Sequence, residues 1–192
     1  KNIYGEIVYV ISNNPDAYGI ERAKKYNIPV KIIDHKSYTD RDDFDDALKD
    51  FLDNLEIDLI ILAGFMRILG KNITEKFYGK MINLHPSLLP LYPGLNTHTQ
   101  ALNNKDKYHG ISIHFVSAEL DAGPLIAQGK VSVKADDDLE KLVSKIHKVE
   151  HDLLPKIINE LCTNNIYLNC ETNKVMYSDN LDSKMSVTYF ND

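Results

Sequence analysis

The sequence predicts an α/β domain built on a mostly parallel sheet, with helices on both faces and an antiparallel C-terminal extension. β-Branched runs alternate with amphipathic segments through the first half of the chain, which is typical of a parallel sheet. The run DLIILAG at 58–64 is apolar on both faces, as a central parallel strand should be. Two strand-like runs near 110–117 and 124–133 are joined by a short turn, which predicts the antiparallel extension.

Composition limits the number of domains and the classes of partner. The chain has 192 residues, 43% of them hydrophobic, which supports one domain over 1–192 with a polar tail at 163–192. A net charge of −6 without a Lys/Arg-rich block argues against nucleic acid as a partner. The apolar stretch LIILAGFM is too short to span a membrane, so no membrane association is expected. Two cysteines without a signal-peptide pattern favour free thiols and a cytoplasmic location.

The individual elements follow from periodicity and from capping residues. The first strand is EIVYVIS at 6–12, and the helix after it is expected to begin with Asn14 as N-cap and Pro15 in its first turn. Thr39 is expected to cap an acidic helix with an apolar stripe. Apolar positions from 139 to 161 follow helical spacing. The other expected strands are 30–34, 58–64, 81–85, 110–117, 124–133 and 166–168, and the other helices are 72–79 and 97–105.

Polar side chains gather where two of these strands are expected to be neighbours. Residues two apart share a strand face, so Asn83 and His85 point the same way, as do Ser112 and His114. A loop after the second of these strands carries Asp121 in ELDAGP. In a parallel α/β sheet the ligand crevice lies beyond the carboxyl ends of the strands. An amide donor, an imidazole and a carboxylate there could stabilise an oxyanion and move a proton.

The pattern by itself leaves two alternatives open. Asn83 could simply cap the loop, with His85 a buried histidine whose hydrogen bonds are satisfied, because Asn-x-His is a common pattern. A metal site could use His147 and His151, which are four residues apart on a helix. No Glu directly follows His147, so the zinc-protease pattern is absent and no metal is expected.

Several ordered motifs resemble those of the folate-dependent formyltransferases. They are NLHPSLLPLYPG, AGFMRIL and HGISIHFVSAELDAGP, and the likeness runs from about residue 6 to about residue 161. SNNPDAYGIERA, AGFMRIL and YPGLNTHTQAL are similar more narrowly to the phosphoribosylglycinamide formyltransferases of purine biosynthesis. The resemblance implies a Rossmann-like formyltransferase fold. It also implies formyl transfer from the co-substrate 10-formyltetrahydrofolate to the amine of glycinamide ribonucleotide (GAR).

The resemblance also implies roles for the polar cluster. Asn83 and a protonated His85 would donate hydrogen bonds to the oxyanion of a tetrahedral intermediate. Asp121 would pair with His85 and, through water, help to carry the proton from the attacking amine to the folate nitrogen. Ser112 and His114 would support these three side chains from behind.

The same resemblance assigns the binding residues. The pterin would lie against Met66, Arg67, Ile68 and Leu69, with apolar walls from Leu62, Phe65 and Val116. Arg41 would meet the glutamate tail of the folate, although it reads equally well as a solvated residue at a helix start. Glu150 and His147 would bind the ribonucleotide.

Other functions remain as alternatives. A formyltetrahydrofolate deformylase would send the formyl group to water, but its relatives carry an HH variant of the motif and a regulatory domain that are not seen here. A tRNA formyltransferase would need a basic C-terminal domain, whereas the tail here is slightly acidic. A non-catalytic folate or nucleotide-binding protein would not need all of Asn83, His85 and Asp121. We expect a monomer or a weak homodimer.

One feature of the family is not found in the sequence. Rossmann-like sheets normally start with a strand whose glycine-rich turn holds a phosphate. Here the first strand is preceded only by KNIYG. We therefore expect roughly twenty or more further residues upstream of Lys1, enough for that strand and its phosphate loop.

Overall fold

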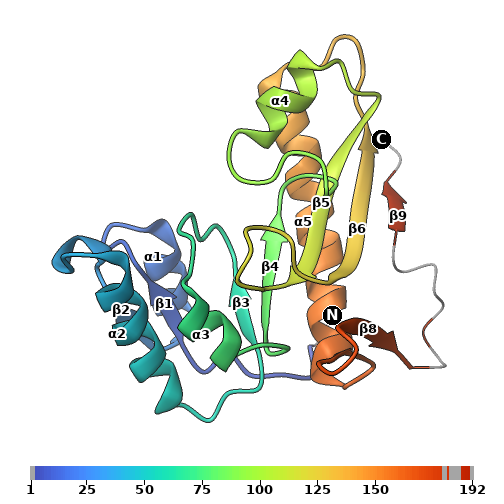
Figure 1. Cartoon of the computed structure of the whole chain (residues 1–192). Coiled ribbons are helices and arrows are strands. Elements are labelled where there is room, and N and C mark those ends of the chain that lie inside the picture. The colour runs from blue at the N-terminus through green and yellow to red at the C-terminus, as the bar shows by residue number, and fades with distance from the viewer. Residues whose placement is uncertain (1–2, 179–180, 182–186, 191–192) are drawn as a thin grey trace.

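The computed structural model describes residues 3–178, 181 and 187–190 (Figure 1). Its elements are β1 Val10–Ser12, α1 Tyr18–Lys25, β2 Val30–Ile32, η1 His35–Ser37, α2 Arg41–Asp53, β3 Ile60–Leu62, α3 Lys71–Lys76, β4 Met81–His85, α4 Thr97–Asn103, β5 Tyr108–Phe115, β6 Leu125–Ser132, α5 Leu139–Cys162, β7 Ile166–Asn169, β8 Lys174–Tyr177 and β9 Val187–Phe190.

The main sheet has five strands in the order β3-β4-β5-β6-β9. β3 and β4 are parallel, and so are β6 and β9, whereas β5 runs antiparallel to both β4 and β6. β1 and β2 form a separate parallel pair on the N-terminal side. The predicted Rossmann-like α/β class and the predicted antiparallel extension through β5 and β6 are therefore confirmed.

Two apolar clusters hold the layers together. In the first, α5 packs along β5 and β6 with fully buried side chains such as Leu142, Ile146 and Ile157, which confirms the apolar stripe predicted for this helix (Figure 1). In the second, α2 and α3 pack with Phe44, Leu48 and Ile73 against the ends of β3 and β4. Burying such stripes supplies most of the stability of helices this short. The two clusters meet at β4, the strand that carries Asn83 and His85.

Several predicted boundaries are wrong in detail. α1 begins after Ala17, and Asn14 instead accepts a hydrogen bond from the backbone N–H of Asp16 in a turn. The cap of α2 is Asp40 rather than Thr39, because the Asp40 carboxylate accepts from the N–H of Asp43 at 2.9 Å. At α1 the Asn14 side chain bonds within a turn before the helix, and at α2 two neighbouring polar residues could bond the same free N–H groups, so the sequence does not fix which one does.

The first and third strands are shorter than predicted, and the third is not central. β1 covers only 10–12 of the expected 6–12, and β3 covers 60–62 of the expected 58–64. Among the described residues, β3 pairs with β4 alone and so forms an edge of the five-stranded sheet. Apolar side chains in this region are correspondingly exposed: Ile7 before β1, Ile32 in β2 and Ile61 in β3.

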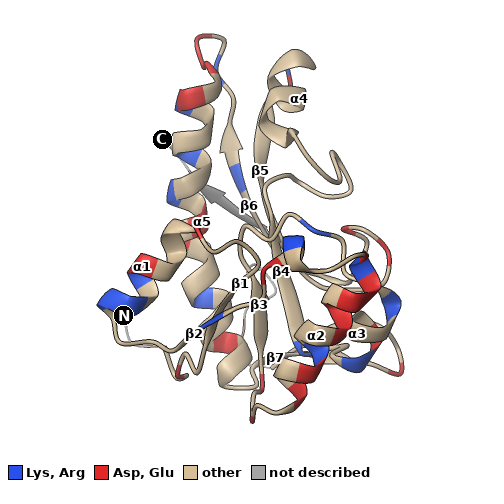
Figure 2. Cartoon of the chain, turned by 90° about the vertical axis from the view of Figure 1, so that its left-hand side faces the viewer, with Lys and Arg blue, Asp and Glu red and all other residues tan. Residues whose placement is uncertain are grey.

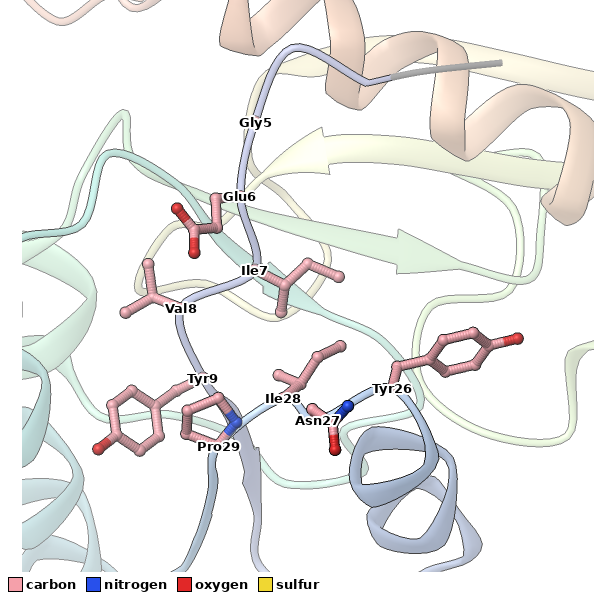
Figure 3. Close-up of a pocket in the computed structure, with 9 residues that line it drawn as sticks. All are labelled: Gly5, Glu6, Ile7, Val8, Tyr9, Tyr26, Asn27, Ile28 and Pro29. Atoms are coloured by element: carbon pink, nitrogen blue, oxygen red, sulfur yellow. The ribbon is translucent and has the colours of Figure 1, made fainter.

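An open groove of about 670 Å³ runs along the segment that leads into β1. It is lined by residues 5–9 and 26–29, and Figure 3 shows Ile7 and Ile28 pointing to one side of the chain with Val8 and Tyr9 on the other. Among the described residues no ladder joins β1 to β3, and Figure 1 shows the two strands set apart. The groove therefore borders a break in the sheet.

The C-terminal segment contains more structure than its polar composition predicts. Beyond the expected strand near 166–168, β7 and β8 form an antiparallel hairpin. The Tyr177 hydroxyl on this hairpin donates to the Ile126 carbonyl of β6 at 2.6 Å, which attaches the hairpin to the main sheet. Within the described ranges, no helix combines the length and apolar character needed to cross a bilayer.

Candidate active site

The pairing of β4 with β5 brings four polar side chains together. In this antiparallel register Asn83 lies opposite His114, and His85 lies opposite Ser112. Directly opposite residues in a ladder place their side chains on the same face. The predicted convergence of two imidazoles, an amide and a hydroxyl is therefore what the structure contains. His85, Ser112 and His114 are buried, and Asn83 is half-buried.

Asp121 reaches this cluster from the loop that follows β5. Its Oδ2 lies 3.4 Å from His85 Nδ1, and its Oδ1 accepts from Asn83 Nδ2 at 3.4 Å. The Gly94 N–H donates to Asp121 Oδ2 at 2.8 Å and so holds the carboxylate from its other side. The backbone of Asp121 is left-handed, with φ of 50°, a conformation that Asp adopts more readily than most residues. Such backbone outliers tend to occur at functional sites, where the surroundings fix them.

Both ring nitrogens of His85 face oxygen atoms that can accept a hydrogen bond. Its Nε2 lies 2.8 Å from the Tyr92 carbonyl oxygen, which can only accept a hydrogen bond. Its Nδ1 faces the Asp121 carboxylate, which is a second acceptor. The His85 ring is thus held between the backbone of the 86–94 loop and the Asp121 carboxylate.

His114 has the opposite character. Its Nδ1 donates to the Phe115 carbonyl at 2.9 Å, so in the neutral ring Nε2 is free to accept. Asn83 Nδ2 lies 3.3 Å from that nitrogen. Burial lowers the pKa of His114, and this outweighs the opposing effects of the Phe115 carbonyl and of Asp121. Neutral His114 therefore orients the Asn83 amide.

The proline-rich loop at 86–94 is fixed by side chains from three other elements. The Ser112 hydroxyl on β5 donates to the Ser87 carbonyl at 2.7 Å and accepts from the Leu89 N–H at 3.0 Å. Gln128 on β6 donates to the Leu89 carbonyl at 2.9 Å, and Thr97 on α4 donates to the Pro86 carbonyl at 2.6 Å. The Leu89–Pro90 peptide bond is cis. This loop presents the Tyr92 carbonyl to His85 and the Gly94 N–H to Asp121.

An apolar wall borders the polar cluster on its β3 side. Leu62, the last residue of β3, pairs in parallel register with Asn83. Leu62, Phe65, Leu69 and Val116 belong to one apolar cluster. The predicted folate-side residues differ in exposure. Leu69 is buried beneath the segment, whereas Met66 and Ile68 are exposed, Met66 by 70%. The Leu69 side chain faces the core, so at this position only backbone atoms are placed to contact a ligand.

The two predicted folate-side arginines lie in the part of the molecule where α2 approaches the 64–70 segment. The Arg67 guanidinium lies over the Phe44 ring, 4.9 Å from its centroid. Arg41, the first residue of α2, is half-exposed, with its Nε 3.8 Å from an Asp42 carboxylate oxygen. Figure 2 shows acidic and basic residues interspersed along α2 and α3. Arg41 thus lies on a charged face of α2. This position fits both a contact with the folate tail and a solvated residue at the start of a helix.

The predicted ribonucleotide residues lie on α5. Burial raises the pKa of Glu150, and the nearby His147 and His151 partly oppose this. None of the described hydrogen bonds joins Glu150 or His147 to Asn83, His85 or Asp121. Burial lowers the pKa of His98 on α4, and the charges of His147 and His85 lower it further.

Four residues of this region were not predicted from the sequence. Tyr92 acts through its backbone carbonyl, for which no side-chain pattern exists. His98 Nδ1 and His109 Nε2 form a contact of 3.0 Å between α4 and β5, and neither residue stood out in the motifs. Asp45 is a buried carboxylate in the apolar face of α2, and its place within a hydrophobic stripe was the signal that could have identified it.

Comparisons with known proteins agree with this arrangement. A family model described as formyl transferase matches residues 1–158. The phosphoribosylglycinamide formyltransferase of Haemophilus influenzae is 41% identical over 157 residues, covering 82% of this chain and 74% of that protein. The Escherichia coli enzyme of the same name is 42% identical over 159 residues, covering 83% of this chain and 75% of that protein.

A solved structure extends the likeness to three dimensions. The phosphoribosylglycinamide formyltransferase of Coxiella burnetii superposes with a TM-score of 0.87 at 42% sequence identity, covering 96% of this chain and 86% of that one. Identity at this level over most of both chains, with the same fold, excludes a chance resemblance of short motifs. The chain therefore belongs to the formyl transferase family.

Proposed function

We propose that this chain transfers a formyl group from 10-formyltetrahydrofolate to the amine of glycinamide ribonucleotide, as an enzyme of purine biosynthesis. The observation that carries the proposal is the arrangement of Asn83, His85 and Asp121 around one position at the carboxyl end of β4. The names of the similar bacterial enzymes support the choice of acceptor.

In the proposed reaction, the amine nitrogen of the ribonucleotide attacks the formyl carbon, and a new C–N bond forms. The formyl oxygen takes up the negative charge of the tetrahedral intermediate. Asn83 Nδ2 would donate one hydrogen bond to it, and His85 Nδ1–H would turn from Asp121 to donate a second. Preorganised donors of this kind lower the barrier because they need no rearrangement as the charge develops.

The intermediate collapses when the bond between the formyl carbon and folate N10 breaks. The attacking amine loses a proton and N10 gains one, so the products are formylglycinamide ribonucleotide and tetrahydrofolate. Asp121 is the group that can relay this proton, with water as the bridge. The Gly94 N–H holds one carboxylate oxygen in place while the other faces Asn83.

We further propose that the folate lies over the 64–70 segment, with Leu62, Phe65 and Val116 forming the apolar wall. Backbone groups at 66–69 would recognise the polar edge of the pterin, since Leu69 faces the core. Arg67 and Arg41 would lie toward the anionic tail of the folate. On the opposite side, Glu150 and His147 would meet the ribonucleotide.

We also propose that one more parallel strand completes the sheet between β1 and β3, with a phosphate-binding turn at its end. The supporting observations are the unpaired facing edges of these strands and the exposed apolar side chains Ile7, Ile32 and Ile61. Ribonucleotide binding should be measured with the present chain and with one extended upstream. Equal affinities would show that the phosphate is held elsewhere, with His147 as the candidate.

The experiment that separates the alternatives offers the purified chain three acceptors with 10-formyltetrahydrofolate. These are glycinamide ribonucleotide, initiator methionyl-tRNA and water alone. The proposal predicts rapid formation of tetrahydrofolate only with the ribonucleotide. Equal release of formate without an acceptor would indicate a deformylase, and tight folate binding without turnover would indicate a binding protein.

A further inference from the structure

A buried carboxylate connects α2 to the end of the 64–70 segment. Asp45 is 5% exposed, and its Oδ2 accepts from the Gly70 N–H at 2.5 Å. Gly70 is the N-cap of α3, so this bond joins α2, the segment and α3 at one point. A carboxylate is well suited to this position, because the N-terminus of a helix carries free N–H groups and a partial positive charge.

α2 holds the same segment at a second point, one residue earlier in the helix. Phe44 lies beneath the Arg67 guanidinium, whose centre is 4.9 Å from the ring centroid. Consecutive residues of α2 thus contact the middle and the end of the segment. The exposed side chain of Ile68 lies between these two attachments, and that of Met66 directly precedes the first of them.

Two buried polar atoms at this junction have no hydrogen-bond partner. Among the described residues they are the only such side-chain atoms, and they have complementary character: Asp45 Oδ1 and Arg67 Nε. Buried polar groups are rarely left unpaired, so each exception calls for an explanation. Burial raises the pKa of Asp45, while the Gly70 N–H and the charges of Arg41 and Arg67 favour the ionised form.

We propose that Asp45 is a positioning residue that sets the folate-binding surface of the 64–70 segment. Its bond to Gly70 fixes the height of the segment above the apolar wall. Its carboxylate interacts electrostatically with Arg41 and Arg67, the two arginines that we place toward the anionic tail of the folate. This role rests on the proposed folate site, and it assigns to α2 a part in co-substrate affinity that is separate from the transfer chemistry at Asn83, His85 and Asp121.

The test compares Asp45→Ala, Asp45→Asn and the control Asp46→Asn. Asp46 is the next residue of α2, but its carboxylate is exposed and meets only Lys49, at 3.7 Å. Binding of tetrahydrofolate should be measured by calorimetry, and kcat and both KM values by formyl transfer. Asp45→Ala should weaken tetrahydrofolate binding and raise the folate KM by about tenfold or more, the scale of losing a charge-assisted hydrogen bond. The ribonucleotide KM should stay within about twofold of the wild type.

A second readout follows the bond itself. The Gly70 amide proton should lie downfield in the NMR spectrum of the wild type and of Asp46→Asn. In Asp45→Ala it should move upfield and exchange faster with solvent. Asp45→Asn keeps an acceptor oxygen but loses the charge, so it should retain most of the downfield shift with intermediate folate affinity.

The outcomes distinguish this role from the proposed function. Equal tetrahydrofolate affinity in wild type and Asp45→Ala, with an active wild type, would overturn the role of Asp45 alone. Failure of the wild type to bind tetrahydrofolate would overturn both. Should Asp45→Ala fail to fold, Asp45→Asn decides, and unchanged folate affinity in that variant would overturn the role.

Discussion

His85 and Asp121 are buried in contact with each other: His85 Nδ1 lies 3.4 Å from Asp121 Oδ2, and the side-chain exposures are 5% and 7%. The other ring nitrogen of His85, Nε2, contacts the Tyr92 carbonyl oxygen, and the Gly94 N–H donates a hydrogen bond to the same Asp121 oxygen. Both groups are therefore held by backbone atoms of the 86–94 loop. Each side chain of the pair therefore has a second, fixed contact in a buried site.

The first prediction concerns the three groups placed at the reacting atoms. Asn83→Ala, His85→Ala and Asp121→Ala should each lower kcat by about 10²-fold or more, the scale of losing one oxyanion donor or proton-transfer group. Folate affinity should change much less, because the proposed folate contacts lie at 62–69. Steady-state kinetics together with tetrahydrofolate titration separate the two effects. Full activity of Asp121→Ala would show that Asp121 only shapes the turn and takes no part in catalysis.

The second prediction concerns the support of the proline-rich loop. Ser112→Ala removes a buried hydroxyl that bonds the Ser87 carbonyl and the Leu89 N–H and accepts from Gln128. It should lower the free energy of unfolding by about 1–3 kcal/mol, because buried partners are left unpaired. Urea denaturation measures the change. The control is Ser117→Ala, where the lost hydrogen bond is exposed and little should change; similar losses in both variants would contradict the account.

The third prediction concerns Gly94, whose φ is +81° and whose N–H holds Asp121. Gly94→Ala should destabilise the fold by about 1 kcal/mol or more and displace the carboxylate, so that kcat falls as well. Gly19→Ala is the matched control, because Gly19 lies within α1 and an added Cβ meets no atom within 4 Å. That change should be neutral or stabilising, since alanine favours helix. A drop in kcat with Gly19→Ala but not with Gly94→Ala would reverse this interpretation.

The fourth prediction concerns the dependence of stability on pH. Burial, and next the neighbouring His98, lower the pKa of His109 to about 4, against an ordinary 6.5. The unfolded chain therefore binds this proton more readily than the folded one, so His109 costs stability as the pH falls from about 6.5 toward 4. At about 1.4 kcal/mol per pKa unit, the full effect is about 3 kcal/mol.

His109→Gln should weaken the dependence of stability on pH between about pH 6.5 and pH 4. His98 and His114, whose pKa values burial also lowers, contribute in the same direction and remain in the variant. Thermal unfolding of both proteins from pH 7 to pH 4.5 measures the difference in slope. Parallel curves would show that His109 takes up its proton as easily in the folded state as in the unfolded one.

The sequence predicted the parts of the site that depend on local order. Alternation along β4 and β5 placed Asn83 with His85 and Ser112 with His114, and these pairs do face each other across the ladder. The sequence could not predict contacts made by backbone atoms, such as Tyr92 with His85. It also placed 58–64 at the centre of the sheet from its apolar character, whereas β3 is an edge of the five-stranded sheet. Apolar composition indicates that a strand can be buried. It does not indicate the position of the strand in the sheet, because that depends on which other strands pair with it.

The most direct test of the central claim follows the formyl carbon. The wild-type chain and Asn83→Ala should be incubated with 10-formyltetrahydrofolate labelled with ¹³C in the formyl group and with glycinamide ribonucleotide, and the products read by mass spectrometry. The wild type should form labelled formylglycinamide ribonucleotide at a rate about 10²-fold or more above that of Asn83→Ala. Label that appears in formate instead, or equal rates for the two proteins, would contradict it.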